Sequence, residues 1–245
     1  MKEIKASDKE RRAEMEIPKV ETRLEVKNEA DSETAELYLY GTIRQAYWWD
    51  EEDDCISSKR VMQALKELKG KDVNVHINSP GGDVFESIAI CNLFKQHDAD
   101  INIIVDSLAG SGASIIATAG KKVIMYTNSM QMIHNAWTYA AGNADELRKV
   151  ANDLDKIDTA VKASYKGRFV GTDDELEALL KDESWLTAEE CLAFGLCDEI
   201  MDEPEKGDPQ GSVKETLFNK YKKNISTEVD KKSTLFNLKP KGEKK

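Results

Sequence analysis

The sequence predicts an α/β fold in which a parallel sheet is covered by helices. Short runs of alternating apolar residues are followed by longer runs with apolar residues three and four apart, and the two patterns take turns along residues 35–202. Strands that alternate with helices over short connections favour parallel β units. In such sheets, sites form at the carboxyl ends of strands, where helices begin.

Three strands and three helices are expected in the first half of this region. Val73, Val75 and Ile77 alternate in one strand, while Val61 and Leu65 share a helix face. The strands are expected at residues 36–43, 72–79 and 99–107. The helices are expected at residues 57–70, 83–97 and 111–120.

The second half is expected to contain two short strands and then helices. The most distinctive element is a long helix over residues 144–170, with apolar residues at helical spacing: Leu147, Val150, Leu154, Ile157 and Val161. The strands are expected at 121–127 and 130–136, and shorter helices at 173–181 and 188–194.

Both ends of the chain differ in composition from the middle. Residues 1–34 are rich in charge and poor in large apolar groups, so we expect a mobile or partner-dependent arm. Residues 203–245 contain proline, glycine and many lysines, and we expect a loosely held extension. The folded domain is therefore placed at residues 35–202.

Composition excludes several classes of partner and cofactor. With 46 acidic and 35 basic residues the net charge is −11, which disfavours nucleic acid and anionic membrane surfaces. Four cysteines without CxxC spacing and three histidines form no zinc pattern. The chain has no GxxxxGK[ST] loop, no signal-peptide pattern and no apolar run of about 18 residues. We expect a soluble cytoplasmic protein with reduced thiols and no cofactor.

The first candidate site element is the turn INSPGGDVFES at residues 77–87. Pro80 ends the strand, and Gly81 and Gly82 allow positive φ or close backbone approach before a helix. Free N–H groups at a helix start suit an oxyanion. A tight strand-to-helix turn without further function explains the same residues.

The second element is DSLAGSGASIIATAG, residues 106–120. Ser111 stands where a helix begins and is a candidate nucleophile, with the N–H of Gly112 as a second oxyanion donor. Ser114 is the reserve nucleophile. The alternative is that Ser111 only caps the helix.

A histidine and an acidic pair complete the set of candidates. His134 follows an apolar strand in MQMIHNAW, whereas His76 and His97 do not adjoin a small-residue turn. Asp182 and Glu183 precede WLTAEE, and a carboxylate there could orient the histidine or be an ordinary solvated charge.

In combination, these motifs resemble the proteolytic subunit of the ATP-dependent Clp protease family. The similarity covers about residues 38–201, and its most specific parts are INSPGG and WLTAEECLAFGLCDEI. It implies a Clp protease or crotonase-like spiral of ββα units from which the long helix protrudes as a handle. It also implies a serine endopeptidase with the roles divided as follows: nucleophile Ser111, general base His134, third triad member Glu183 with Asp182 in reserve, and oxyanion donors Gly82 and Gly112.

Some positions depart from the family pattern. Gly112 stands where the family commonly has Met, Asn135 and Ala136 replace Gln-Pro, and Glu183 replaces Asp. Together with the charged arm and the lysine-rich tail, these departures resemble the Clp-like proteases of tailed phages and prophages. That branch is assigned to head maturation, in which capsid or scaffold proteins are cleaved.

The resemblance also implies partners. They are further copies of the chain in a heptamer or stacked rings, a polypeptide substrate, and an AAA+ unfoldase that would be the component using ATP. Two other functions stay open: a non-catalytic ring scaffold with a decayed site, and an acyl-CoA-binding crotonase-like enzyme. Tyr47, Trp48 and Trp49 either form an exposed aromatic surface or pack on the core.

Overall fold

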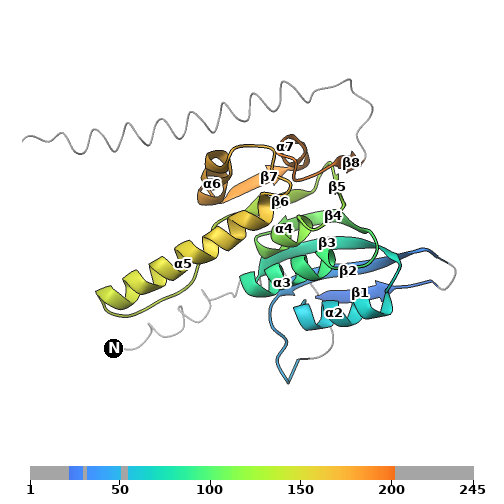
Figure 1. Cartoon of the computed structure of the whole chain (residues 1–245), viewed down its shortest axis with the longest axis horizontal. Coiled ribbons are helices and arrows are strands. Elements are labelled where there is room, and N and C mark those ends of the chain that lie inside the picture. Colours follow the sequence, from blue (N-terminus) through green and yellow to red (C-terminus); the bar gives the residue numbers. More distant parts are fainter. Residues whose placement is uncertain (1–21, 30–31, 51–54, 202–245) are drawn as a thin grey trace, which may run out of the picture.

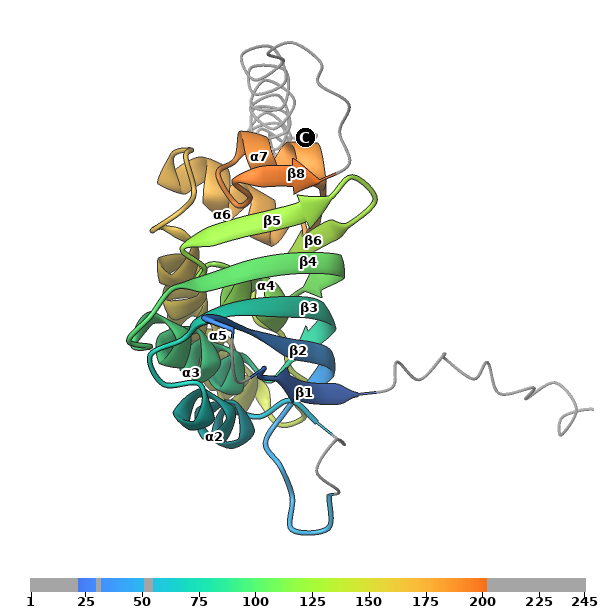
Figure 2. The ribbon, with the colours of Figure 1, turned by 90° about the vertical axis from the view of Figure 1, so that its right-hand side faces the viewer.

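The computed structural model describes residues 22–29, 32–50 and 55–201, which are built around one sheet of eight strands (Figure 1). The strands are β1 (Arg23–Lys27), β2 (Thr34–Ile43), β3 (Asp72–Gly82), β4 (Ile101–Gly110), β5 (Lys122–Tyr126), β6 (Met130–Ile133), β7 (Ser184–Thr187) and β8 (Glu199–Met201). The main path of the sheet runs β1-β2-β3-β4-β5-β8, and Figure 2 shows the strands in this order. The predicted α/β class is confirmed.

Strand β4 is shared between two branches of the sheet. Residues 102–105 pair in parallel with β5, and residues 108–110 pair in parallel with β6. Strand β7 then pairs with β6 in the antiparallel direction. The end of β4, which directly precedes Ser111, therefore lies beside β6, which directly precedes His134.

Six described helices accompany the sheet. They are α2 (Ser58–Glu67), α3 (Val84–Lys95), α4 (Gly112–Ala117), α5 (Ala144–Tyr165), α6 (Asp173–Lys181) and α7 (Ala188–Ala193). In Figure 2 the strands face the viewer, with α2, α3 and α4 to the side and behind. The inward side chains of β2, β3 and β4 are buried against these helices, among them Leu37, Val75 and Ile103. This is the alternation from which the strands were predicted.

The long helix α5 extends away from the sheet (Figure 1). It begins with a capping box between Asn143 and Glu146, and its buried residues are Val161 and Tyr165, near its end. No helix in the described ranges is long and apolar enough to cross a membrane.

The structure adds three strands to the predicted elements. Strand β1 lies in the part of the chain assigned to the charged arm and pairs with β2, so the sheet begins before residue 35. Strands β7 and β8 are the other two, and α5 ends at Tyr165 rather than at residue 170. Residues 1–21 of the arm and the predicted extension at 203–245 lie outside the described residues.

The aromatic cluster after β2 is exposed. The exposed fractions are 51% for Tyr47, 90% for Trp48 and 62% for Trp49. Tyr47 stacks on Trp49 with ring centroids 4.8 Å apart. Of the two alternatives, the described structure therefore shows an aromatic surface rather than packing on the core.

Candidate active site

Ser111 forms a sharp turn between β4 and α4. Its φ is 51° and its ψ is −122°, a conformation that costs a residue with a side chain about 1–3 kcal/mol. Ser111 occupies the N-cap position of α4, but its side chain makes no capping hydrogen bond. Its backbone N–H donates to the carbonyl of Met132 at 2.7 Å, which ties the turn to β6. The turn therefore leaves the hydroxyl available to a group other than the helix end.

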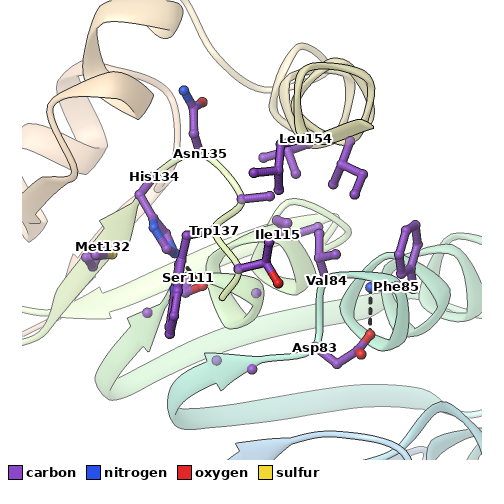
Figure 3. Close-up of a pocket in the computed structure, with 18 of the residues that line it drawn as sticks. Asp83, Val84, Phe85, Ser111, Ile115, Met132, His134, Asn135, Trp137 and Leu154 are labelled. Carbon is purple, nitrogen blue, oxygen red and sulfur yellow. Dashed lines mark hydrogen bonds between the residues drawn. The ribbon is translucent and has the colours of Figure 1, made fainter. Parts of the chain in front are cut away.

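That group is the imidazole of His134. His134 follows the last residue of β6, and its Nε2 lies 2.7 Å from Ser111 Oγ. Figure 3 shows the ring of His134 pointing toward Ser111. The pairing of β6 with the end of β4 produces this contact, because it places the two strand ends side by side.

The surroundings of His134 favour its neutral form. Burial lowers the pKa of His134, while the charges of Glu183 and Asp158 act in the opposite direction. A neutral imidazole with its proton on Nδ1 can accept the proton of Ser111 at Nε2.

The two predicted acidic residues, Asp182 and Glu183, differ in their relation to His134. Glu183 has a φ of 50°, is exposed, and acts on His134 through its charge. Asp182 caps the end of α6 and is not among the charges that act on His134. In the described part of the chain, no hydrogen bond joins Nδ1 of His134 to either carboxylate. The contribution of Glu183 in this conformation is therefore electrostatic.

The two predicted oxyanion donors lie close together beside Ser111. Gly112 is the first residue of α4, so its N–H has no acceptor within the helix. A Cβ built on Gly112 would lie 3.6 Å from the nitrogen of Gly82 and 2.1 Å from Oγ of Ser87. A Cβ on Gly82 would lie 1.9 Å from the carbonyl oxygen of Ile43. Gly82 therefore has no room for a side chain, a Cβ on Gly112 would have to displace Oγ of Ser87, and the nitrogen of Gly82 lies beside Gly112.

Gly81 belongs to the same site, although the sequence analysis gave it no separate role. Its φ is +91°, and a Cβ there would lie 2.5 Å from the carbonyl oxygen of Gly110 and 2.8 Å from Cβ of Ser111. The signal was the first glycine of SPGG, which indicated a close backbone approach but not the partner of that approach.

Ser114, the reserve nucleophile, has a different position. It is fully buried, and its Oγ lies 2.6 Å from the carbonyl oxygen of Ser111, 3.1 Å from that of Met132 and 2.7 Å from the hydroxyl of Tyr165. A serine hydroxyl has one proton to donate to these carbonyls, so Tyr165 is the donor to Ser114. Ser114 thus supports the turn from inside.

The two other histidines lie elsewhere. His76 is held between two carboxylates, with Nδ1 2.9 Å from Asp106 and Nε2 2.9 Å from Glu36. His97 lies 3.0 Å from the carbonyl oxygen of Lys71 through Nε2. Neither contacts Ser111.

A cavity of about 810 Å³ opens in front of Ser111 and His134. One side is formed by the two glycine turns, and another by α5, from which Leu154 projects (Figure 3). Most of its lining is apolar: Val84, Phe85, Leu108, Ile115, Met132, Trp137, Val150, Leu154, Ile157, Val161 and Trp185. The described residues contain no group of three or more His, Cys, Asp or Glu side chains that could hold a metal ion.

Comparison with known proteins supplies the family. The model of the Clp protease family matches residues 44–204. The chain belongs to the Clp protease family. This membership confirms the resemblance inferred from the motifs and makes the chain a serine-type peptidase.

Curated relatives carry the same family name. The chain is 33% identical over 141 residues to the ATP-dependent Clp protease proteolytic subunit of Ligilactobacillus salivarius, covering 56% of this chain and 70% of that protein. For the subunit so named in Bacteroides fragilis the identity is 28% over 134 residues, covering 54% and 65%. For that of Streptococcus suis it is 33% over 143 residues, covering 54% and 69%. The match thus spans about two thirds of each relative.

Proposed function

We propose that this chain is an endopeptidase that hydrolyses peptide bonds through an acyl-enzyme on Ser111. Ser111 Oγ attacks the peptide carbonyl carbon while its proton passes to Nε2 of His134. His134 then gives this proton to the leaving amine as the C–N bond breaks. Water hydrolyses the ester by the same route. The observation that carries the proposal is the 2.7 Å contact between the two side chains at a strained turn facing a cavity.

The negative charge of the tetrahedral intermediate requires donors near Ser111. We assign this role to the amides of Gly82 and Gly112, because Gly112 directly follows Ser111 and the nitrogen of Gly82 lies beside Gly112. Loss of one such donor typically costs on the order of 10²–10³ in rate. Glu183 is proposed as the third member of the triad, because its charge stabilises the imidazolium. Asp182 is not supported in this role.

The proposed substrate is a polypeptide. An extended chain can lie along the cavity, whose apolar lining favours segments with apolar side chains. The chemistry of this site needs no metal, cofactor or nucleotide. Use of ATP would require a separate AAA+ unfoldase, in keeping with the words "ATP-dependent" and "proteolytic subunit" in the relatives' names.

We also propose that the chain acts as a ring-forming homo-oligomer, a heptamer or stacked rings, in the cytoplasm. The projecting helix α5 supports this, because Leu147 on it is 43% exposed and most of the helix is not buried by its own chain. The departures at Gly112, Asn135, Ala136 and Glu183 are the basis for a phage-type role, the cleavage of capsid or scaffold proteins in head maturation.

The test is labelling of the purified full-length chain with a fluorophosphonate, with the modified residue located by mass spectrometry. We expect one label on Ser111, none in Ser111→Ala, and a large loss in His134→Ala. Ser107→Ala, an exposed serine on the same strand, is the matched control and should label as the wild type does. A folded wild-type chain that takes no label would contradict the proposal and favour the ring scaffold.

A further inference from the structure

The segment that carries His134 is held from two sides. The backbone N–H of Asn135 donates to the carbonyl of Leu180 at the end of α6, at 3.1 Å. The N–H of Ala136 donates to Oδ1 of Asp158 on α5, at 2.7 Å. These bonds follow β6 directly, so they fix the backbone just after the imidazole.

Asp158 also acts on His134 through its charge. Two carboxylates affect the imidazole in this way, Glu183 after α6 and Asp158 from α5. Asp155, one turn earlier on α5, acts on Asp158. On balance the pKa of Asp158 is raised, by burial first and then by the charge of Asp155, against the lowering effects of its bond with Ala136 and of the charge of His134.

The two carboxylates differ in how firmly they are held. Glu183 is exposed, and among the described residues its side chain makes no hydrogen bond. Asp158 is half-buried, and a backbone donor fixes its carboxylate. The charge of Glu183 has the larger effect on His134 and that of Asp158 the smaller, but only Asp158 is also fixed by a hydrogen bond to the segment that carries the imidazole.

We propose that Asp158 is a positioning residue for the catalytic histidine. By accepting the N–H of Ala136 it fixes the segment that carries the imidazole, and its negative charge stabilises the imidazolium formed when His134 takes the proton of Ser111. In this role Asp158 acts as a carboxylate and takes no proton from His134. Asp158 and Glu183 together fill the role that one carboxylate has in a usual triad, which is to orient the histidine and to stabilise its charged form. This inference rests on the proposed acyl-transfer function.

The test compares Asp158→Asn with wild type by the second-order rate of fluorophosphonate labelling between about pH 5 and pH 9. The amide oxygen of Asn can still accept from Ala136, so this variant removes the charge and keeps the bond. We expect the limiting rate to fall about tenfold. We also expect the acid limb of the profile to move to lower pH, because loss of a negative charge lowers the pKa of His134.

Two variants serve as controls. Asp145→Asn removes a charge of the same kind from the exposed far end of the same helix and should leave both rate and midpoint unchanged. Asp158→Glu restores the charge and should return the midpoint toward the wild-type value. A purely structural role for Asp158 would leave the midpoint in place in Asp158→Asn.

A second measurement does not depend on reactivity. The chain has three histidines, so a nuclear magnetic resonance titration of the labelled imidazoles resolves His134 by comparison with His134→Ala. The midpoint of His134 should fall in Asp158→Asn. Suppose that wild type labels on Ser111 but that Asp158→Asn moves neither the midpoint of the labelling profile nor that of the His134 titration. This inference is then wrong and the proposed function stands. If wild type takes no label, the proposed function itself fails.

Discussion

At the scale of single residues, the geometry of the site depends on glycines, because a Cβ atom at these positions would collide with neighbouring atoms. A Cβ on Gly81 would come within 2.7 Å of the nitrogen of Gly112 and within 2.8 Å of Cβ of Ser111. The nucleophile and an oxyanion donor are therefore both pressed against one glycine. Their separation is set by backbone packing, which no rotamer change can relieve.

We predict that Gly81→Ala lowers the rate of Ser111 labelling at least about 100-fold, because a misplacement of about 1 Å can cost this much. Gly70→Ala is the matched control. Gly70 also has positive φ, +77°, but nothing lies within 4 Å of a Cβ there. Both variants lose about 1 kcal/mol to backbone strain, so a difference in labelling reports the contact with Ser111. Equal labelling of the two variants would count against this account.

At the scale of elements, α5 and α4 are joined through a buried hydrogen bond. The hydroxyl of Tyr165, at the end of α5, donates to Ser114 inside α4, and Ser114 in turn donates to a carbonyl at the base of the turn. Tyr165 is 1% exposed. The base of the long helix is thereby fixed to the turn that carries Ser111.

We predict that Tyr165→Phe lowers the free energy of unfolding by about 1–2 kcal/mol, because it removes this bond without leaving a cavity. Tyr139→Phe, at a position 91% exposed, should change it by less than about 0.5 kcal/mol. Urea denaturation followed by circular dichroism measures both. A loss in the Tyr139 variant as large as that in the Tyr165 variant would contradict the assignment.

The elements that sequence could predict are those that carry their own pattern. Strands β2 and β3 alternate over ten and eleven residues, β4 begins with the mostly apolar run INIIV, and the predicted ranges of all three overlap the observed ones. Strands β7 and β8 have four and three residues, too few to show a period, and they form because β6 and β5 offer them partners. Strand β1 does alternate Leu24 and Val26, but the charges around them favoured an arm.

The residues of the site likewise fall into those that a local motif reveals and those that only tertiary packing brings together. Ser111, His134, Gly82 and Gly112 stand in motifs that can be recognised along the chain. Asp158 and Tyr165 lie on a helix whose polar residues look like a solvated face, and their contacts arise only when α5 packs beside β6 and α4. The choice between Asp182 and Glu183 likewise depended on how the end of α6 turns, which no local pattern gives.

At the scale of the whole molecule, the sheet face not covered by α2, α3 and α4 carries a polar network. His76 lies between Asp106 and Glu36, Tyr40 donates to Asp106 at 2.7 Å, and the ring of Tyr38 stacks on the imidazole at 4.6 Å. Burial opposes protonation of His76, but its hydrogen bonds and charge interactions with Asp106 and Glu36 raise its pKa above 6.5. The network therefore favours the imidazolium.

The stability of the fold should depend on pH through this group. Because the pKa of His76 is higher in the folded state, its stabilisation is complete below about pH 6.5 and is lost as pH rises through the folded-state value. We predict that the difference in free energy of unfolding between wild type and His76→Asn is larger at about pH 6 than at about pH 9. Urea denaturation at the two pH values measures it, and a difference that does not shrink at the higher pH would refute the prediction.

The attachment of α5 has a mechanical consequence. The helix is buried at Val161 and Tyr165, while three other residues that line the cavity, Val150, Leu154 and Ile157, lie further toward its other end. At 1.5 Å per residue, Val150 lies about 22 Å along the axis from Tyr165, so a tilt of roughly 5° at the base moves it by about 2 Å. The width of the cavity therefore depends on the angle of α5 as well as on the side chains that line its wall.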